Sequence, residues 1–194
     1  HFIEELSMIS PRLLSFVLGT AMVAGCAAGP IDSGPIAVTI NSLNEGDVGS
    51  DGAVWKDGNI STGTSNPWGD FVKAAEEECG GSPVSFEFTS ATVVIEFDGS
   101  ATVDETFGGR AEVRILSTQG SDDDADKAAI ASIETLSGAG PHSLDVGAGQ
   151  DHSSLHSRLL GGDFHVGFWA EVADPDADLD INITITLEAL ANCE

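Results

Sequence analysis

Residues 179–189 read Leu-Asp-Ile-Asn-Ile-Thr-Ile-Thr-Leu-Glu-Ala, and apolar and polar side chains alternate through the whole stretch. Successive side chains of an extended chain point to opposite faces, so this period of two predicts a strand with one face on a core. A strand whose other face is polar is typical of antiparallel sheets, because parallel sheets are covered on both faces. The stretch therefore predicts an antiparallel β-protein.

The same alternation recurs at Phe164–Val172, which predicts a second strand of this kind. We expect it to pair with residues 179–189 as the last hairpin of the chain. Weaker strand patterns lie at Ile36–Ile40 and Ser143–Val146.

A three-stranded meander is expected in the middle of the chain, because an Asp-Gly and a Gly-Gly turn signal separate three alternating runs. The runs are Ala91–Phe97, Ala101–Phe107 and Ala111–Ile115. The alternation changes phase near Thr89-Ser90, which predicts a β-bulge. With about eight strands in all, the fold class expected is all-β, an antiparallel two-sheet sandwich of jelly-roll-like form with two or three short helices.

Three segments have helical signals. Trp68–Glu78 follows Asn-Pro and ends at a Gly pair. Asp124–Leu136 begins with acidic residues, which suit the positive end of a helix dipole, and carries apolar residues at helical spacing. A turn or two is expected at His152–Leu160.

The segment 8–26 has a basic residue at Arg12, a mostly apolar run and then small residues before a cysteine, the layout of a secretory signal peptide. Its ending, Val23-Ala24-Gly25-Cys26, resembles the lipobox of bacterial lipoproteins. The resemblance implies cleavage before Cys26, a diacylglycerol on its thiol, and a mature protein anchored by lipid in the cell envelope, at the outer membrane or cell surface. The alternatives are a transmembrane helix, for which the apolar run is shorter than the roughly 20 residues needed, and a soluble secreted protein.

This interpretation divides the chain into four parts. Residues 1–7 are expected to be an upstream artefact, residues 8–25 the signal peptide, residues 26–35 a Gly- and Pro-rich tether, and residues 36–194 a single sandwich domain.

The charge of the chain is strongly negative, with 32 acidic against 7 basic residues and a formal net charge of −25. Such a surface repels phosphate backbones, so nucleic acid is excluded as a partner. Two interpretations stay open, a solvated acidic coat and an acidic patch for one specific partner.

Two cysteines, Cys79 and Cys193, remain once Cys26 carries lipid. An oxidising envelope compartment favours a disulfide between them. One alternative is two buried free thiols. The other is a metal site, although neither cysteine lies in a Cys-x-x-Cys pattern.

Two acidic runs are candidate calcium sites, because calcium takes six to eight oxygen ligands and closely spaced Asp residues supply several. The first has Asp at alternate positions, and the second opens the expected helix at 124–136. The candidate ligands are Asp174, Asp176, Asp178 and Asp180 in the first run, and Asp122 and Asp124 in the second. The first run departs from an EF-hand, since Leu179 and Ile185 stand where that loop has Gly and an acidic ligand. The alternatives are a solvated turn for the first run and helix capping for the second.

Trp169 lies on the polar face of its expected strand together with His165 and Glu171. An exposed aromatic ring there would stack on a sugar, whereas a ring beneath a covering helix or loop would only pack. The sequence has no Gly-x-Ser-x-Gly motif, phosphate loop or dinucleotide fingerprint, so we expect no catalysis.

The function expected is a binding or structural role for a lipid-anchored envelope protein, with an envelope protein or a carbohydrate as partner. The first alternative is a carbohydrate-binding module, possibly calcium-dependent, that uses the Trp169 face or the loops around Trp55 and Trp68. The second alternative is an envelope hydrolase, which needs a cleft with convergent polar groups.

Overall fold

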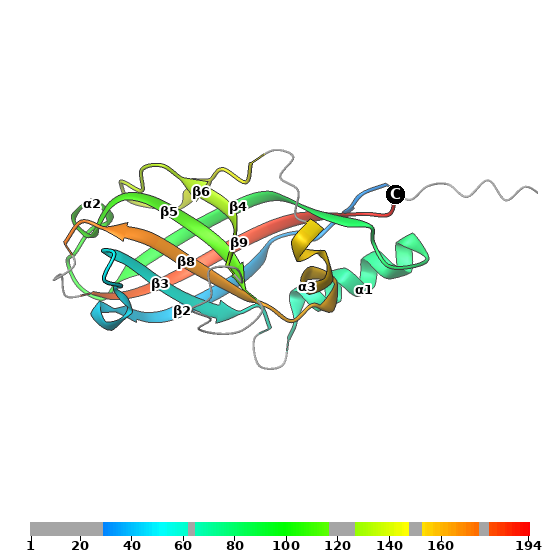
Figure 1. Ribbon diagram of the computed structural model, residues 1–194, viewed down its shortest axis with the longest axis horizontal. Coiled ribbons are helices and arrows are strands. Elements are labelled where there is room, and N and C mark those ends of the chain that lie inside the picture. Colours follow the sequence, from blue (N-terminus) through cyan, green and yellow to red (C-terminus); the bar gives the residue numbers. More distant parts are fainter. Residues whose placement is uncertain (1–28, 62–64, 117–126, 148–152, 175–178) are drawn as a thin grey trace, which may run out of the picture.

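A computed structural model describes residues 29–61, 65–116, 127–147, 153–174 and 179–194, which form two antiparallel sheets packed face to face (Figure 1). Sheet A has the order β1-β9-β4-β7, with β2 also paired to β9, and sheet B has the order β3-β8-β5-β6. The predicted antiparallel sandwich is therefore confirmed. The strands are β1 (Ile31–Asp32), β2 (Ile36–Asn44), β3 (Ala53–Asn59), β4 (Ser85–Phe97), β5 (Phe107–Leu116), β6 (Ala128–Ile133), β7 (His142–Leu144), β8 (His165–Val172) and β9 (Asp180–Asn192).

Strand β9 lies inside sheet A and follows the predicted alternation. Its odd-numbered residues from Ile181 to Ala191 are fully buried, and the intervening residues face outward. It pairs with β4 on one side and with β2 and β1 on the other. The register on β4 shifts between Phe88 and Ser90, which confirms the bulge predicted there.

The connections, in contrast, do not form the local hairpins that the sequence predicts. Strands β8 and β9 lie in opposite sheets, so the expected last hairpin is wrong. Strands β4 and β5 also lie in opposite sheets, so the expected meander is wrong as well. Alternation shows that one face of a strand is buried, but it does not distinguish pairing within a sheet from packing across the core. From β2 to β9, only β5 and β6 are consecutive strands of one sheet, and this exchange between sheets is the jelly-roll arrangement.

The middle strand of that meander, expected at Ala101–Phe107, is replaced by the short helix α2 (Val103–Thr106). Thr102 and Glu105 form a reciprocal capping box at its start, so both of their backbone amides are hydrogen-bonded where the chain crosses between sheets.

The helix expected at Asp124–Leu136 is also wrong where the structure describes it, because Ala128–Ile133 forms strand β6 on the edge of β5. The register shifts between Val113 and Arg114, and the adjacent residues Ile130 and Ala131 are both buried. This irregularity breaks the period of two and hides the strand from an alternation test.

The two other predicted helices are confirmed, and both lie at one end of the sandwich, where the C-terminus also lies (Figure 1). They are α1 (Pro67–Cys79) and α3 (His156–Gly161), which follows the 3-10 turn η3 (Ser153–Leu155). The indole of Trp68 on α1 is fully buried among Phe side chains, and its Nε1 donates to the Leu159 carbonyl at 2.7 Å. At the opposite end lie α2 and η1 (Glu45–Asp47) (Figure 1).

A disulfide joins Cys79, the last residue of α1, to Cys193 just after β9, with the two Cα atoms 5.2 Å apart. It therefore ties the helical end of the molecule to sheet A. No helix in the described part of the chain is long and apolar enough to span a membrane.

We expect this disulfide to stabilise the fold strongly, because it joins residues 114 positions apart and restricts the unfolded chain. In the chain-entropy model, a loop of that length is worth about 4–5 kcal/mol. The double variant Cys79→Ala/Cys193→Ala should lose about that much free energy of unfolding, measured by urea denaturation. Adding a reductant should destabilise the parent and leave the double variant unchanged. A parent midpoint that does not respond to reductant would contradict the prediction.

Candidate functional site

The outer face of sheet B carries a hollow of about 920 Å³ that we call the sheet-B hollow. It is lined from β3, β5, β8, the start of β6 and the loop that contains η1. Trp55 of β3 pairs in register with Trp169 of β8, and Trp169 pairs in turn with Glu112 of β5. The jelly-roll register therefore places two indoles and a carboxylate side by side across three strands.

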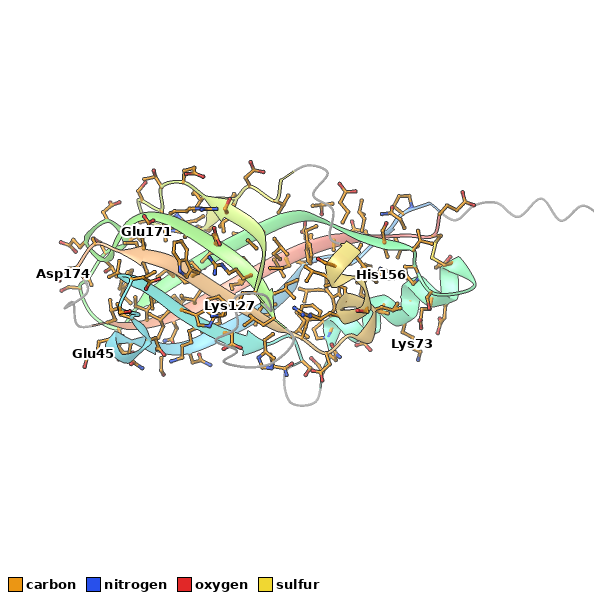
Figure 2. All side chains as sticks on the ribbon, viewed as in Figure 1. Glu45, Lys73, Lys127, His156, Glu171 and Asp174 are labelled. Carbon is orange, nitrogen blue, oxygen red and sulfur yellow. A yellow bond between two sulfur atoms is a disulfide. The ribbon has the colours of Figure 1, made fainter. Side chains whose placement is uncertain are left out.

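Each indole in the hollow has a cation over its ring. The Arg114 guanidinium carbon is 5.1 Å from the Trp169 ring centroid, and the Lys127 ammonium is 5.1 Å from the Trp55 ring centroid. A cation held over an aromatic face is attracted to the ring quadrupole by about 0.5–1 kcal/mol at exposed sites. Figure 2 shows Lys127 over the middle of the sandwich, well away from the ends.

Glu112 fixes the position of Arg114 through an ion pair. The residue is only 4% exposed, and its carboxylate contacts the Arg110 guanidinium at 2.5 Å and the Arg114 Nε at 2.7 Å. Residues 110, 112 and 114 share one face of β5 because they alternate along the strand. A buried carboxylate needs such partners, so the two arginines are required for its burial. The ion pairs in turn restrict the conformations of both arginine side chains.

Gly167 sets the position of the Trp55 ring. It lies between Asp57 and Arg114 in the register of sheet B, and a Cβ built on it would lie 2.0 Å from Cη2 of Trp55. The indole therefore rests directly on the backbone of β8, which only a glycine permits.

Strand β3 forms one rim of the hollow and is braced against the η1 turn. The Lys56 ammonium donates to the Asp47 carboxylate at 2.8 Å and to the Ser42 carbonyl at 2.6 Å. Asn44 caps η1 by accepting from the Gly46 amide, and Asp47 accepts from the Asn44 amide. These contacts fix the loop that walls the site.

Beyond the hollow, His165 lies near the end of β3. Its Nδ1 is 3.1 Å from the Asp57 carboxylate, and its Nε2 is 3.4 Å from the Asn59 amide nitrogen. Both the His165 and Asp57 side chains are mostly buried. The imidazole thus braces the strand rather than facing the hollow.

The three ligand residues predicted from sequence therefore have different places. Trp169 lines the hollow, and among the described residues it is Arg114, not a helix, that lies over its ring. His165 and Glu171 share its strand but lie outside the lining, and Glu171 accepts a hydrogen bond from the Arg110 amide at 3.2 Å.

Sequence reasoning named the loop around Trp55 as a possible sugar site but did not place Trp55 beside Trp169, and it missed three further residues of the site. They are Glu112, Arg114 and Lys127. The alternation of Arg110, Glu112 and Arg114 opposite an apolar face was a usable signal for β5. Trp55 lies on a strand with a charged residue on each face, so its pattern gives no alternation.

Of the candidate calcium ligands, Asp122, Asp124, Asp176 and Asp178 lie outside the described residues. Asp174 and Asp180 are both exposed, and the backbone oxygen of Asp180 accepts from the Asp98 amide. Among the described residues, no group of three potential metal ligands comes together. Calcium binding at these runs stays a prediction.

Comparisons with known proteins give little beyond the fold. No protein-family model matches the chain. No curated protein matches it either. A chain in the solved structure of Cocksfoot mottle virus is similar at 10% identity and a TM-score of 0.35, over 99% of this chain and 95% of that one. A likeness of that degree carries no argument about what this protein does.

Substituting Gly167 should disturb the hollow without touching the core. In Gly167→Ala the new methyl group forces the Trp55 ring off β8, so the near-ultraviolet circular dichroism should change. We expect the free energy of unfolding to fall by about 1–3 kcal/mol, as in other overpacked sites. Gly161→Ala on α3 is the matched control, because its Cβ would meet no atom within 4 Å. Identical spectra and stabilities for the two variants would refute the placement of Trp55.

Proposed function

We propose that this protein is a carbohydrate-binding module, anchored by lipid in the cell envelope, and that the sheet-B hollow is its binding site. The observation that carries the proposal is the pairing of Trp55 with Trp169 inside an open polar hollow. Sugar rings have apolar C–H faces that stack on indoles, and hydroxyl groups that hydrogen-bond to charged and polar side chains.

The size and rigidity of the hollow support this proposal. About 920 Å³ is within the range of small-molecule sites and leaves room for more than one sugar ring. The site is built on strands, and buried Glu112 and Gly167 fix the positions of Arg114 and Trp55. Binding therefore requires little ordering of the strands that carry the two indoles, which reduces its entropic cost.

The direction of the expected tether is compatible with an exposed site. β1 begins the described chain at the end that carries α1 and the C-terminus, whereas η1, which walls the hollow, lies at the opposite end (Figure 1). A lipid on Cys26 would then hold the helical end toward the membrane and leave the η1 end facing outward.

Removing either indole should abolish most glycan binding. We expect Trp55→Ala and Trp169→Ala each to weaken binding about tenfold or more, since burial of an aromatic face is worth about 1.5–3 kcal/mol. Binding hits would come from a glycan array and affinities from calorimetry. Val84→Ala, which removes a hydrophobic side chain that is 54% exposed, is the control and should bind like the parent. Absence of any glycan hit, or hits that survive in both Trp variants, would refute the proposal.

The anchor is tested separately. In the full chain expressed in a bacterium, Cys26→Ser should abolish incorporation of labelled fatty acid and move the protein from the detergent phase to the aqueous phase. Cys79→Ser, which alters a cysteine outside the lipobox, should still incorporate label. Equal labelling of Cys26→Ser and the parent would exclude a lipid on that thiol.

A further inference from the structure

We infer that the sheet-B hollow selects glycans that carry carboxylates, such as uronic-acid oligosaccharides, over neutral glycans of the same size. This inference rests on the proposed carbohydrate-binding function and specifies its ligand class. It follows from the distribution of positive charge, from the free edge of one guanidinium and from the cations that cover both indoles.

Positive charge is concentrated on this sheet. The chain has 7 basic residues against 32 acidic ones, and four of the basic residues belong to sheet B or immediately precede one of its strands. They are Lys56, Arg110, Arg114 and Lys127. Three of these, Lys56, Arg114 and Lys127, line the hollow together with Asp47, Asp51, Asp57 and Glu112. With three basic and four acidic residues, this lining is much closer to neutral than the chain as a whole, and an anion in the hollow meets cations at contact distance.

Arg114 presents hydrogen-bond donors that the described residues do not use. Glu112 accepts from its Nε, and the guanidinium carbon lies over the Trp169 ring. Within the described part of the chain, its two Nη groups make no hydrogen bond, although the side chain is only 21% exposed. The edge of a guanidinium pairs with a carboxylate through two parallel hydrogen bonds. A sugar hydroxyl in place of the carboxylate, or a lysine ammonium in place of the guanidinium, does not reproduce this pair.

The cations over the indoles are a second reason to expect a preference for glycans that carry carboxylates. A neutral sugar that stacks on Trp169 must displace Arg114 from the ring, and the lost cation–π contact is not replaced. A sugar with a carboxylate displaces the same cation but pairs with it. Binding of an acidic sugar therefore exchanges one interaction for another, whereas binding of a neutral sugar only loses one.

The net charge of −25 opposes any anion at long range, but this repulsion is screened. The Debye length is about 8 Å at physiological ionic strength, so distant carboxylates contribute little while contacts inside the hollow persist. The selectivity should therefore be measured at about 0.15 M salt.

The test compares uronic-acid oligosaccharides of several sugar types with their carboxyl-reduced counterparts, in which each carboxylate becomes a neutral alcohol. We expect at least one acidic oligosaccharide to bind the protein about tenfold more tightly than its reduced counterpart by calorimetry, the effect of one charged hydrogen-bonded pair. In Lys127→Met and in Arg114→Lys this ratio should fall at least about threefold. Lys73→Met on α1, at the far end of the molecule in Figure 2, removes the same charge and should keep the parent ratio. If Arg114→Lys does not fold, Lys127→Met carries the comparison.

The outcomes separate the two proposals. Equal binding within every pair overturns the selectivity for carboxylates but leaves the carbohydrate-binding function standing. An equal fall of the ratio in Lys73→Met and Lys127→Met also overturns the selectivity, because net charge and not the hollow would then set the preference. Failure of every glycan on the array and of every oligosaccharide to bind overturns both.

Discussion

Strand β9 is the constraint on which the rest of the structure depends. It is hydrogen-bonded along both edges, to β4 on one side and to β2 and β1 on the other, so it cannot shift its register without breaking both ladders. A one-residue slip would also move its row of buried Ile and Leu side chains from the core to solvent. With sheet A fixed in this way, the apolar faces of β3, β5 and β8 have one surface on which to pack, and sheet B must turn its other face outward.

The outward face of sheet B carries two indoles and several basic residues in a chain that is otherwise strongly acidic. The register that packs Phe168 and Val113 inward places Trp169 and Glu112 outward and next to each other. Glu112 could not be buried without two guanidiniums, and one of these, Arg114, is thereby held over Trp169. Stability and binding are linked here, because the same ion pairs that permit a buried carboxylate also organise the proposed ligand surface.

The sequence predicts elements well where the pattern is local and poorly where it is not. Strands β8 and β9, the bulge in β4 and helix α1 are visible because each follows from spacing along a few residues. Their pairing is not visible, since alternation is the same for a hairpin and for two strands that face each other across a core. Strand β6 is masked by a register shift, and β3 has no clear alternation, so Trp55 could not be placed beside Trp169. The arrangement of the candidate site was therefore out of reach without the topology.

The central claim is that ligand binds on the outer face of sheet B, and the three indole N–H signals of a ¹H–¹⁵N NMR spectrum test it most directly. Trp55 and Trp169 line the hollow, whereas Trp68 is fully buried at the helical end and donates to the Leu159 carbonyl. Titration with a glycan that binds should shift the Trp55 and Trp169 signals and leave the Trp68 signal in place. Binding that leaves the Trp55 and Trp169 signals unmoved, or that shifts Trp68 alone, would contradict the assignment of the site to sheet B.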